Sequence, residues 1–356
     1  MCGGRLPTMH TEKENTSSQY SPGLAHSASG ARPSRLLNLS FVVFAGLVGG
    51  IISLFFLADS LAALGIPDPG RVTTFGLPFF RAVAWMLMAL SIGSFMSSAF
   101  LIYPAVPDKD NERLIKARLT VDGHIAARTG AWAAVGAAVV SLLEVPLVMS
   151  DLTGTPLRQV LNPELMGMAV GQIAASQVWL LTAGIAALVA VAGFVARTWA
   201  GQVATFFLSL LLTVPLGMEG HSASGGDHDY GTNSLLLHLF FIMLWVGGLM
   251  GLIAHGRRLG PDMGVAVRRY STVALLSILG LAATGVVNAL IRVELGDLFT
   301  TRYGLLVLSK TVLTVVLAAI GFVHRRVTIP QLKRAPRLFV RVSVVEVLIM
   351  AATVGV

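Results

Sequence analysis

The sequence has 356 residues, of which 54% are hydrophobic and only 12% are charged, and its mean hydropathy is +0.75. Because a soluble domain carries about 25% charged residues, this composition excludes a soluble globule and indicates a protein that crosses a membrane several times. The formal net charge of +8 does not indicate nucleic-acid binding, since the basic residues fall in short segments between apolar runs. Cys2 is the single cysteine, which excludes a disulfide within the chain and a thiolate metal cage.

Residues 1–35 are rich in Ser, Gly and charge, and we expect a disordered cytoplasmic tail. Nine apolar segments follow, each long enough to cross a hydrocarbon core of about 30 Å as a helix. They are 36–64, 79–103, 129–149, 174–196, 201–217, 234–254, 271–291, 303–323 and 338–356. The predicted fold is therefore an all-α, polytopic transmembrane bundle of about nine helices. The last segment has no polar residues after it, which suggests that the sequence is truncated at its C-terminal end.

The predicted domains are a five-helix membrane region over residues 36–217, a loop over 218–233 and a second membrane domain over 234–356. Lys and Arg are concentrated in the tail and in every second loop, and the intervening loops carry few of them. By the positive-inside rule the N-terminus is cytoplasmic, so the 218–233 loop faces outward. We also expect a short interfacial helix on the cytoplasmic side, within residues 104–128.

The 218–233 loop combines side chains that bind transition metals. It contains His221 and His228 among Gly and Ser residues, and His238 follows about one turn into the next predicted helix. Imidazole suits copper, zinc, iron and nickel, thioether favours Cu(I), and a nearby carboxylate joins the ligands or orients an imidazole ring. We predict a three-histidine metal site, completed by one or more of Met218, Glu219, Asp227 and Asp229. An ordinary hydrated loop with unrelated histidines remains the alternative.

Ionisable residues inside predicted spans are costly and usually pair or line a pathway. Lys310 lies about seven residues from the outer end of its helix, and Glu346 lies near the middle of the last helix. Their depths agree within about a turn, so we expect them to pair, with Asn288 nearby. They line a transport path or fix the helix register. We expect Arg81 and Glu144 to form a second pair.

Haem is the rival cofactor, since histidines in transmembrane helices can bind it axially. His238 and His255 share one helix but are about 25 Å apart along it, so they cannot bind the same haem. His255 and His324 fall at predicted cytoplasmic helix ends, and we assign neither a ligand role. The spacing of Gly46 with Gly50, and of Gly247 with Gly251, predicts close helix packing. No nucleotide-binding motif is present, which excludes a copper-pumping ATPase, and we expect no enzymatic activity.

The segment Leu237–Leu249 (LHLFFIMLWVGGL) resembles the opening of the copper-resistance D (CopD) membrane domain. The rest of that pattern follows in register over the last 120 residues or so. Its elements are Arg269-Tyr270-Ser271, Thr284-Gly285 with Asn288, the segment Leu298–Gly304, Lys310, Arg325-Arg326 and Glu346.

This resemblance implies copper transport or copper handling at the cytoplasmic membrane. Gly220-His221 and His228-Asp229 are similar to the pattern that precedes this span in the longer actinobacterial members, which favours an outer copper site. In those members a cytochrome c oxidase assembly-factor domain follows the CopD part. A membrane module that donates copper to oxidase assembly is therefore one alternative, and a b-type haem electron carrier is another. The expected partners are a copper ion and the lipid bilayer, with the oxidase assembly machinery as a further candidate.

Overall fold

The computed structural model describes residues 32–64, 68–102, 104, 111–218, 228–259, 262–292, 298–332 and 336–355. Within these residues every regular element is a helix, so the all-α prediction is confirmed. The same residues contain nine helical stretches that are long and apolar enough to cross a bilayer, as predicted. The long helices are α1 (Arg32–Leu64), α2 (Arg71–Met96), α4 (Val121–Thr153), α7 (Ala174–Val195), α10 (His228–His255), α11 (Met263–Arg292), α12 (Arg302–Val323) and α13 (Pro336–Gly355).

Shorter helices complete or connect these spans. Five are α-helical: α3 (Asn111–Lys116), α5 (Leu157–Val160), α6 (Pro163–Gln172), α8 (Trp199–Leu210) and α9 (Thr213–Met218). The fifth span consists of α8 and α9 with a break between them. Pro215 lacks the backbone N–H that would bond to residue 211, which explains a break at this point. Three further turns extend long helices: η2 (Ser97–Leu101), η4 (Gly256–Arg258) and η6 (His324–Thr328).

Several helices begin before the apolar run that predicted them. Helix α4 begins at Val121 instead of residue 129, and the side chain of Thr120 caps it by accepting a hydrogen bond from the Gly123 N–H at 3.2 Å. Helix α10 begins at His228 instead of residue 234. Helical hydrogen bonding does not stop where the hydrocarbon core ends, so hydropathy underestimates these lengths. The predicted interfacial helix is accordingly reduced to α3, because residues 121–128 belong to α4.

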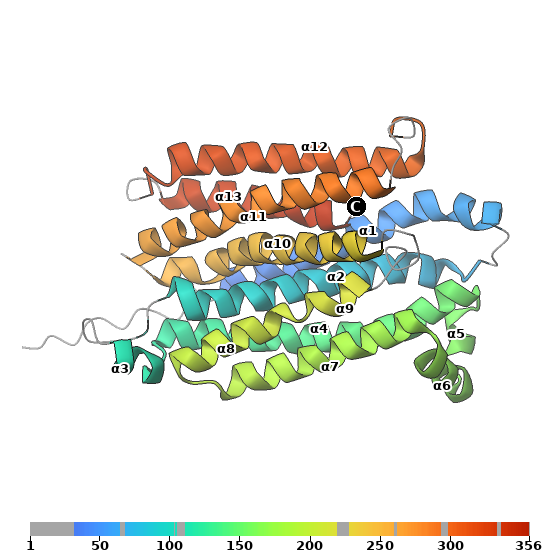
Figure 1. Ribbon diagram of the computed structural model, residues 1–356, viewed down its shortest axis with the longest axis horizontal. Helices are drawn as coiled ribbons and strands as arrows, with labels where there is room; N and C mark the ends of the chain where they lie inside the picture. The colour runs from blue at the N-terminus through green and yellow to red at the C-terminus, as the bar shows by residue number, and fades with distance from the viewer. Residues whose placement is uncertain are drawn as a thin grey trace, which may run out of the picture.

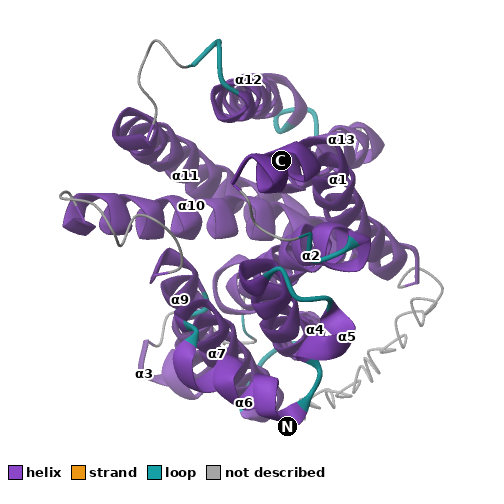
Figure 2. Ribbon diagram, turned by 90° about the vertical axis from the view of Figure 1, so that its right-hand side faces the viewer, coloured by secondary structure: helices purple, strands orange, loops and turns teal. Residues whose placement is uncertain are grey.

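The long helices run roughly parallel to one another along the longest axis of the molecule (Figure 1). Helix α2 occupies the centre and contacts α1, α4, α8 and α10. Helix α1 also packs against α13, so the first and last long helices are neighbours. Helix α12 lies at the edge of the bundle, where Figure 2 shows it beyond α13 and α11. The last four long helices, α10 to α13, are therefore joined to the first half through α2 and α1.

Glycine allows the two halves to approach closely at the crossing of α2 and α10. A Cβ atom on Gly93 would overlap the Gly247 carbonyl, and a Cβ on Gly251 would lie 2.6 Å from the Gly93 carbonyl oxygen. A Cβ on Gly46 would likewise lie 2.9 Å from the Phe79 ring of α2. The predicted packing role of Gly247 with Gly251 and of Gly46 is thus confirmed.

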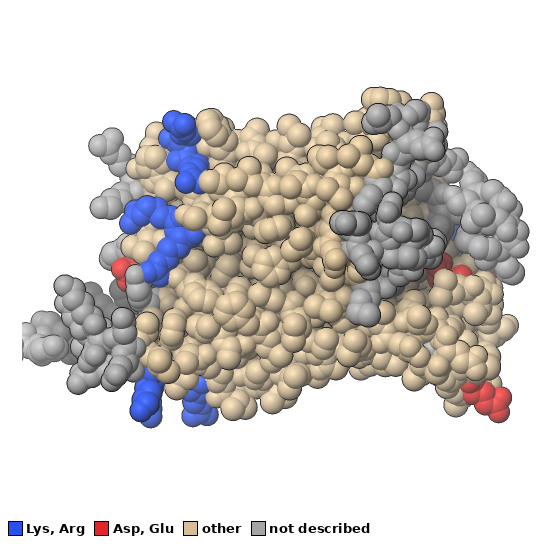
Figure 3. All heavy atoms as spheres, viewed as in Figure 1, with Lys and Arg blue, Asp and Glu red and all other residues tan. Residues whose placement is uncertain are grey.

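Basic side chains on the face shown in Figure 3 gather at one end of the bundle. We call this the basic end, and it holds the start of α4, the end of α10 and the start of α11. We call the other the distal end, where α9 ends and α10 begins. The positive-inside rule predicts that the basic end is cytoplasmic, and this orientation stays a prediction.

Candidate functional site

The predicted metal loop lies at the distal end, and the structure describes only its edges. Met218 is the last residue of α9, and His228 and Asp229 are the first two of α10. His221 lies outside the described residues, as do Glu219 and Asp227. A site formed by His221, His228, Asp229 and Met218 therefore stays a prediction.

His238 and His228 lie farther apart than predicted, and their joint part in a three-histidine site stays a prediction. Both residues lie in helix α10, ten positions apart, which corresponds to about 15 Å along the helix axis. Helix α10 begins six residues before the predicted apolar run, which places His238 nearly three turns inside the helix instead of about one.

His238 instead contacts helix α11. Its Nδ1 lies 2.9 Å from the Thr284 hydroxyl oxygen, and that hydroxyl donates its proton to the Gly280 carbonyl at 2.7 Å. A hydroxyl has one proton, so Thr284 accepts from His238, and the proton of a neutral imidazole lies on Nδ1. The lone pair is then on Nε2. Fixing the tautomer through the opposite nitrogen is how proteins orient metal-binding histidines.

Thr284 is the first member of a polar stripe along α11, formed by Thr284, Ser277 and Tyr270. These residues repeat every seven positions, which places them on one face of the helix at steps of about 10 Å. All three are buried. Ser277 Oγ has no hydrogen-bond partner among the described residues, and the Tyr270 hydroxyl donates to the Trp245 carbonyl of α10 at 2.7 Å. The stripe leads from His238, on the distal side, towards the basic end.

A buried contact between a carboxyl group and an imidazole lies beyond the last member of this stripe. The Glu346 Oε2 atom of α13 is 3.3 Å from His324 Nε2, at the start of η6. Their exposed fractions are 5% and 6%. The His324 ring packs edge-on against Phe339, with ring centroids 5.2 Å apart, and Tyr270 lies within electrostatic range of Glu346. Carboxylate oxygen and imidazole nitrogen are both transition-metal ligands.

The predicted pair of Lys310 with Glu346 is wrong. Glu346 contacts His324, and His324 lies fourteen positions after Lys310 in the same continuous helix. This separation is about 21 Å along the axis, far beyond the roughly 4 Å limit for an ion pair. The side chain of Lys310 is exposed on α12. The prediction estimated the depths of Lys310 and Glu346 by counting residues from the ends of the apolar runs. In the structure the helix that carries Lys310 continues five residues past Val323, as η6.

His324 is the partner of Glu346 that the sequence analysis did not identify. It was expected at a helix end, whereas η6 carries the helix on to Thr328, whose side chain is buried. Because two arginines follow His324, the hydropathy of the sequence falls there although the helix continues. The apolar residues Val327 and Ile329 were the sequence signal that the helix continues. Asn288 lies one turn beyond Thr284 on α11 and is partly buried, so its predicted place on the path is still open.

The first half of the molecule contains the predicted pair of Arg81 and Glu144, which is confirmed. Arg81 Nε of α2 lies 3.5 Å from Glu144 Oε2 of α4. The guanidinium also lies over the Trp179 ring of α7, 5.4 Å from its centroid. Glu144 is fully buried. This contact ties three helices together and includes only one group of a kind that binds metals.

No group of three or more His, Cys, Asp or Glu side chains lies close enough to hold a metal within the described ranges. Two candidate ligand positions therefore lie apart from each other: the pair of Glu346 with His324, and the contact of His238 with Thr284. Each could supply only part of the ligands of one ion. Hydroxyl groups of the stripe, or the loop residues outside the described ranges, would have to supply the rest.

Comparison with known proteins places both halves in one family. The sequence model described as "Copper resistance protein D-like, N-terminal domain" matches residues 72–229, and the one described as "Copper resistance protein D" matches residues 264–356. The second range contains the polar stripe, His324 and Glu346. His238 lies between the two ranges, in the segment whose resemblance to this family was noted above.

Two relatives support the same placement. The chain is 26% identical over 261 residues to the copper transport protein CutJ of Bacillus subtilis (strain 168), which covers 68% of this chain and 45% of CutJ. It is 25% identical over 194 residues to the inner membrane protein YebZ of Escherichia coli (strain K12), covering 52% of this chain and 66% of YebZ. The chain thus spans less than two thirds of either relative. No solved structure matches it.

None of these matches refers to cytochrome c oxidase, so a role in oxidase assembly stays a prediction. A bundle with nine apolar spans among its described residues and with matches in both halves is a multi-pass membrane protein. The chain belongs to the copper-resistance D family.

Proposed function

We propose that this protein moves copper ions across the cytoplasmic membrane, without covalent chemistry, along the polar stripe of α11. In this proposal copper is cargo. It is taken up at the distal end by the 218–233 loop, with His221, His228, Asp229 and Met218 as ligands. It then passes His238 and leaves through the pair of Glu346 and His324 towards the basic end.

The observation that carries the proposal is a line of buried polar groups along one face of α11, with His238 near one end and Glu346 near the other. His238, Thr284 and Ser277 are succeeded by Tyr270 and then Glu346. Buried polar groups in a membrane are costly and usually mark a pathway for ions. The name of CutJ, a copper transport protein, supports copper as the ion.

Glu346 has the central role because a cation loses its hydration inside the bundle. A buried carboxylate lowers the energy of a cation at that depth through direct attraction in a medium of low dielectric constant. His324 adds a nitrogen ligand that suits copper. Together with the fixed tautomer of His238, these groups form two stations along the bundle, each incomplete and therefore able to release the ion again.

The test is copper influx into proteoliposomes that contain the purified protein and an enclosed Cu(I)-sensitive dye. We expect influx with the wild type, and influx at least tenfold slower with Glu346→Gln, which corresponds to about 1.4 kcal/mol in barrier height. Glu164→Gln is the matched control, because Glu164 is exposed on α6 at the distal end and should leave influx unchanged.

Two results would contradict the proposal. Influx no faster than in protein-free liposomes would exclude transport by this chain. Equal influx for wild type and Glu346→Gln would remove the pair of Glu346 and His324 from the path. Copper content of the same samples distinguishes the binding step, because Glu346→Gln should retain the copper bound at the distal loop.

A further inference from the structure

A cavity of about 670 Å³ lies near the basic end, away from the polar stripe. It lies between α1, α2, α4 and the end of α10. Its size is that of a small-molecule site, for which roughly 300 to 1,000 Å³ is typical. None of the residues of the proposed copper path lines it.

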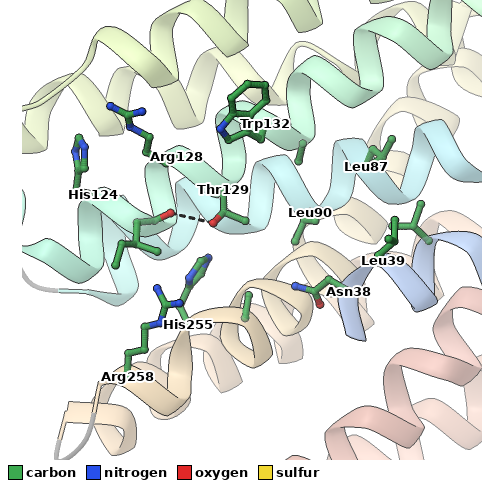
Figure 4. Close-up of a pocket in the computed structure, with 14 residues that line it drawn as sticks. Asn38, Leu39, Leu87, Leu90, His124, Arg128, Thr129, Trp132, His255 and Arg258 are labelled. Carbon is green, nitrogen blue, oxygen red and sulfur yellow. Dashed lines mark hydrogen bonds between the residues drawn. The ribbon is translucent and has the colours of Figure 1, made fainter. Parts of the chain in front are cut away.

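The part of the cavity nearest the basic end is lined by basic side chains. Arg128 and His124 come from the first turns of α4, and His255 and Arg258 come from the end of α10 and from η4. In Figure 4 these four side chains lie on the same side of the cavity. The described residues that line the cavity include no Asp or Glu. An anion at this point would therefore meet only favourable charge.

One of these basic side chains is buried and lacks a partner among the described residues. His255 is 4% exposed, and its Nε2 atom makes no hydrogen bond with them. Asn38 of α1, which also lines the cavity, is equally buried, and its Oδ1 is likewise without a described partner. Buried polar atoms of this kind usually have a partner in the native state. Because His255 and Asn38 both lie on the cavity wall, we infer that a bound molecule supplies their missing hydrogen-bond partners.

The rest of the cavity is apolar and opens sideways. Leu87 and Leu90 of α2 lie deeper along the bundle than the arginines (Figure 4). Leu39 and Trp132 also line it and are 57% and 64% exposed on the outer surface of the helices. In a membrane this surface faces lipid. The cavity therefore combines a basic end with an apolar part that is open to acyl chains.

We propose that this cavity binds an anionic phospholipid, with its phosphate between Arg128, Arg258 and His255. Basic pockets between transmembrane helices commonly hold such head groups. A free phosphate would satisfy the basic groups but would leave the apolar part unfilled, so the shape favours a lipid. A headgroup hydroxyl, as in phosphatidylglycerol, would donate to Asn38 Oδ1.

The test is lipid binding to the delipidated, detergent-purified chain, measured by native mass spectrometry and by the thermal unfolding midpoint. The probes are phosphatidylglycerol, phosphatidylcholine and inorganic phosphate. Phosphatidylcholine carries the same phosphate, but its choline cation offsets that charge. Each arginine near an anionic head group is worth about 1 kcal/mol, so the two together predict a preference of roughly thirtyfold for phosphatidylglycerol over phosphatidylcholine. Arg128→Gln with Arg258→Gln should abolish this preference. Arg325→Gln with Arg326→Gln, which removes two charges from η6 at the same end, should retain it.

Ala133→Leu provides a second variant that keeps every charge. Ala133 lines the cavity and is buried, so a larger side chain there should exclude the acyl chain and weaken phosphatidylglycerol binding. If the arginine double variant does not fold, Ala133→Leu still tests whether the lipid binds in this cavity. The proposal is overturned if either cavity variant binds phosphatidylglycerol as the wild type does. It is also overturned if inorganic phosphate stabilises the wild type as much as phosphatidylglycerol.

Discussion

Among the residues that the structure describes, each half of the molecule buries one carboxyl group against a basic partner, but the two partners differ in kind. Glu144 meets Arg81, and Glu346 meets His324. A guanidinium keeps its charge and has only hydrogen-bond donors, so it cannot bind a metal. An imidazole is the commonest metal ligand among side chains. Equal burial therefore does not mean equal function: the first pair fixes helices, and the second offers two ligand atoms.

The surroundings of the two pairs support this difference. The Arg81 guanidinium also lies over Trp179, so the first pair holds α2, α4 and α7 together. The second pair joins η6 to α13 at the end of the polar stripe. The following four predictions test the contrast.

The largest expected effect is on stability, in the first half. Arg81→Leu leaves the fully buried Glu144 without its cation, and breaking such a pair costs about 3 to 5 kcal/mol. Arg81 is 32% exposed, so we expect the lower value, about 3 kcal/mol. The measurement is the free energy of unfolding in mixed micelles with increasing SDS.

The control for this prediction is the double variant Arg81→Leu with Glu144→Leu. Replacing both partners by apolar residues removes the buried charge, so stability should return to within about 1 kcal/mol of the wild type. A single variant as stable as the wild type would show that the pair does not hold the helices together.

The second expected effect is on transport, in the other half. His324→Gln removes a nitrogen ligand at the end of the proposed path while keeping a polar side chain. We expect copper influx into proteoliposomes to fall at least tenfold, or about 1.4 kcal/mol in barrier height. His10→Gln, in the tail outside the described residues, is the control. Normal influx in His324→Gln would leave Glu346 as the only member of the pair on the path.

The third expected effect concerns the orientation of His238. Thr284→Val removes the acceptor that fixes the imidazole tautomer. Loss of such a partner lowers metal affinity by about 10- to 100-fold, and we expect the lower value for a neutral hydroxyl. The measurement is competition for Cu(I) against a chelator of known affinity. Thr284→Ser should retain the affinity, and Thr272→Val, on the exposed face of the same helix, should not change it.

The smallest expected effect is on the stability that the pair of Glu346 and His324 contributes. The double variant His324→Gln with Glu346→Gln replaces both members of the second pair by neutral side chains of similar size. Its free energy of unfolding should stay within about 1 kcal/mol of the wild type, because a buried pair replaced on both sides is often close to neutral. A loss of 3 kcal/mol or more would mean that this pair also serves mainly to fix helices.

Hydropathy predicted the nine spans because a bilayer about 30 Å thick requires about twenty apolar residues per helix, whatever their neighbours are. The pair of Arg81 and Glu144 was predictable for a related reason. Two opposite charges in adjacent spans at similar depth have few other ways to be satisfied. Gly247 and Gly251, at the crossing of α2 and α10, were predictable from their spacing, which is a local property, whereas their partner Gly93 was not identified.

The site was less predictable. The prediction paired Glu346 with Lys310 and placed His238 about one turn into its helix, and both errors came from helix ends that hydropathy located wrongly. A shift of five or six residues moves a side chain by about 8 Å along the axis and changes which helix face it occupies. Whether His221 and His228 bind copper together remains a prediction.

The sequence by itself determined the class of the protein, the number of spans and the family, because these depend on composition and on local pattern. Apart from the pair of Arg81 and Glu144, only the tertiary structure decided which polar groups meet. The contact of His238 with Thr284, the pair of Glu346 with His324 and the basic cavity each join residues of different helices. Their meeting depends on where every helix begins and ends and on how it is rotated, and packing of the whole bundle sets both.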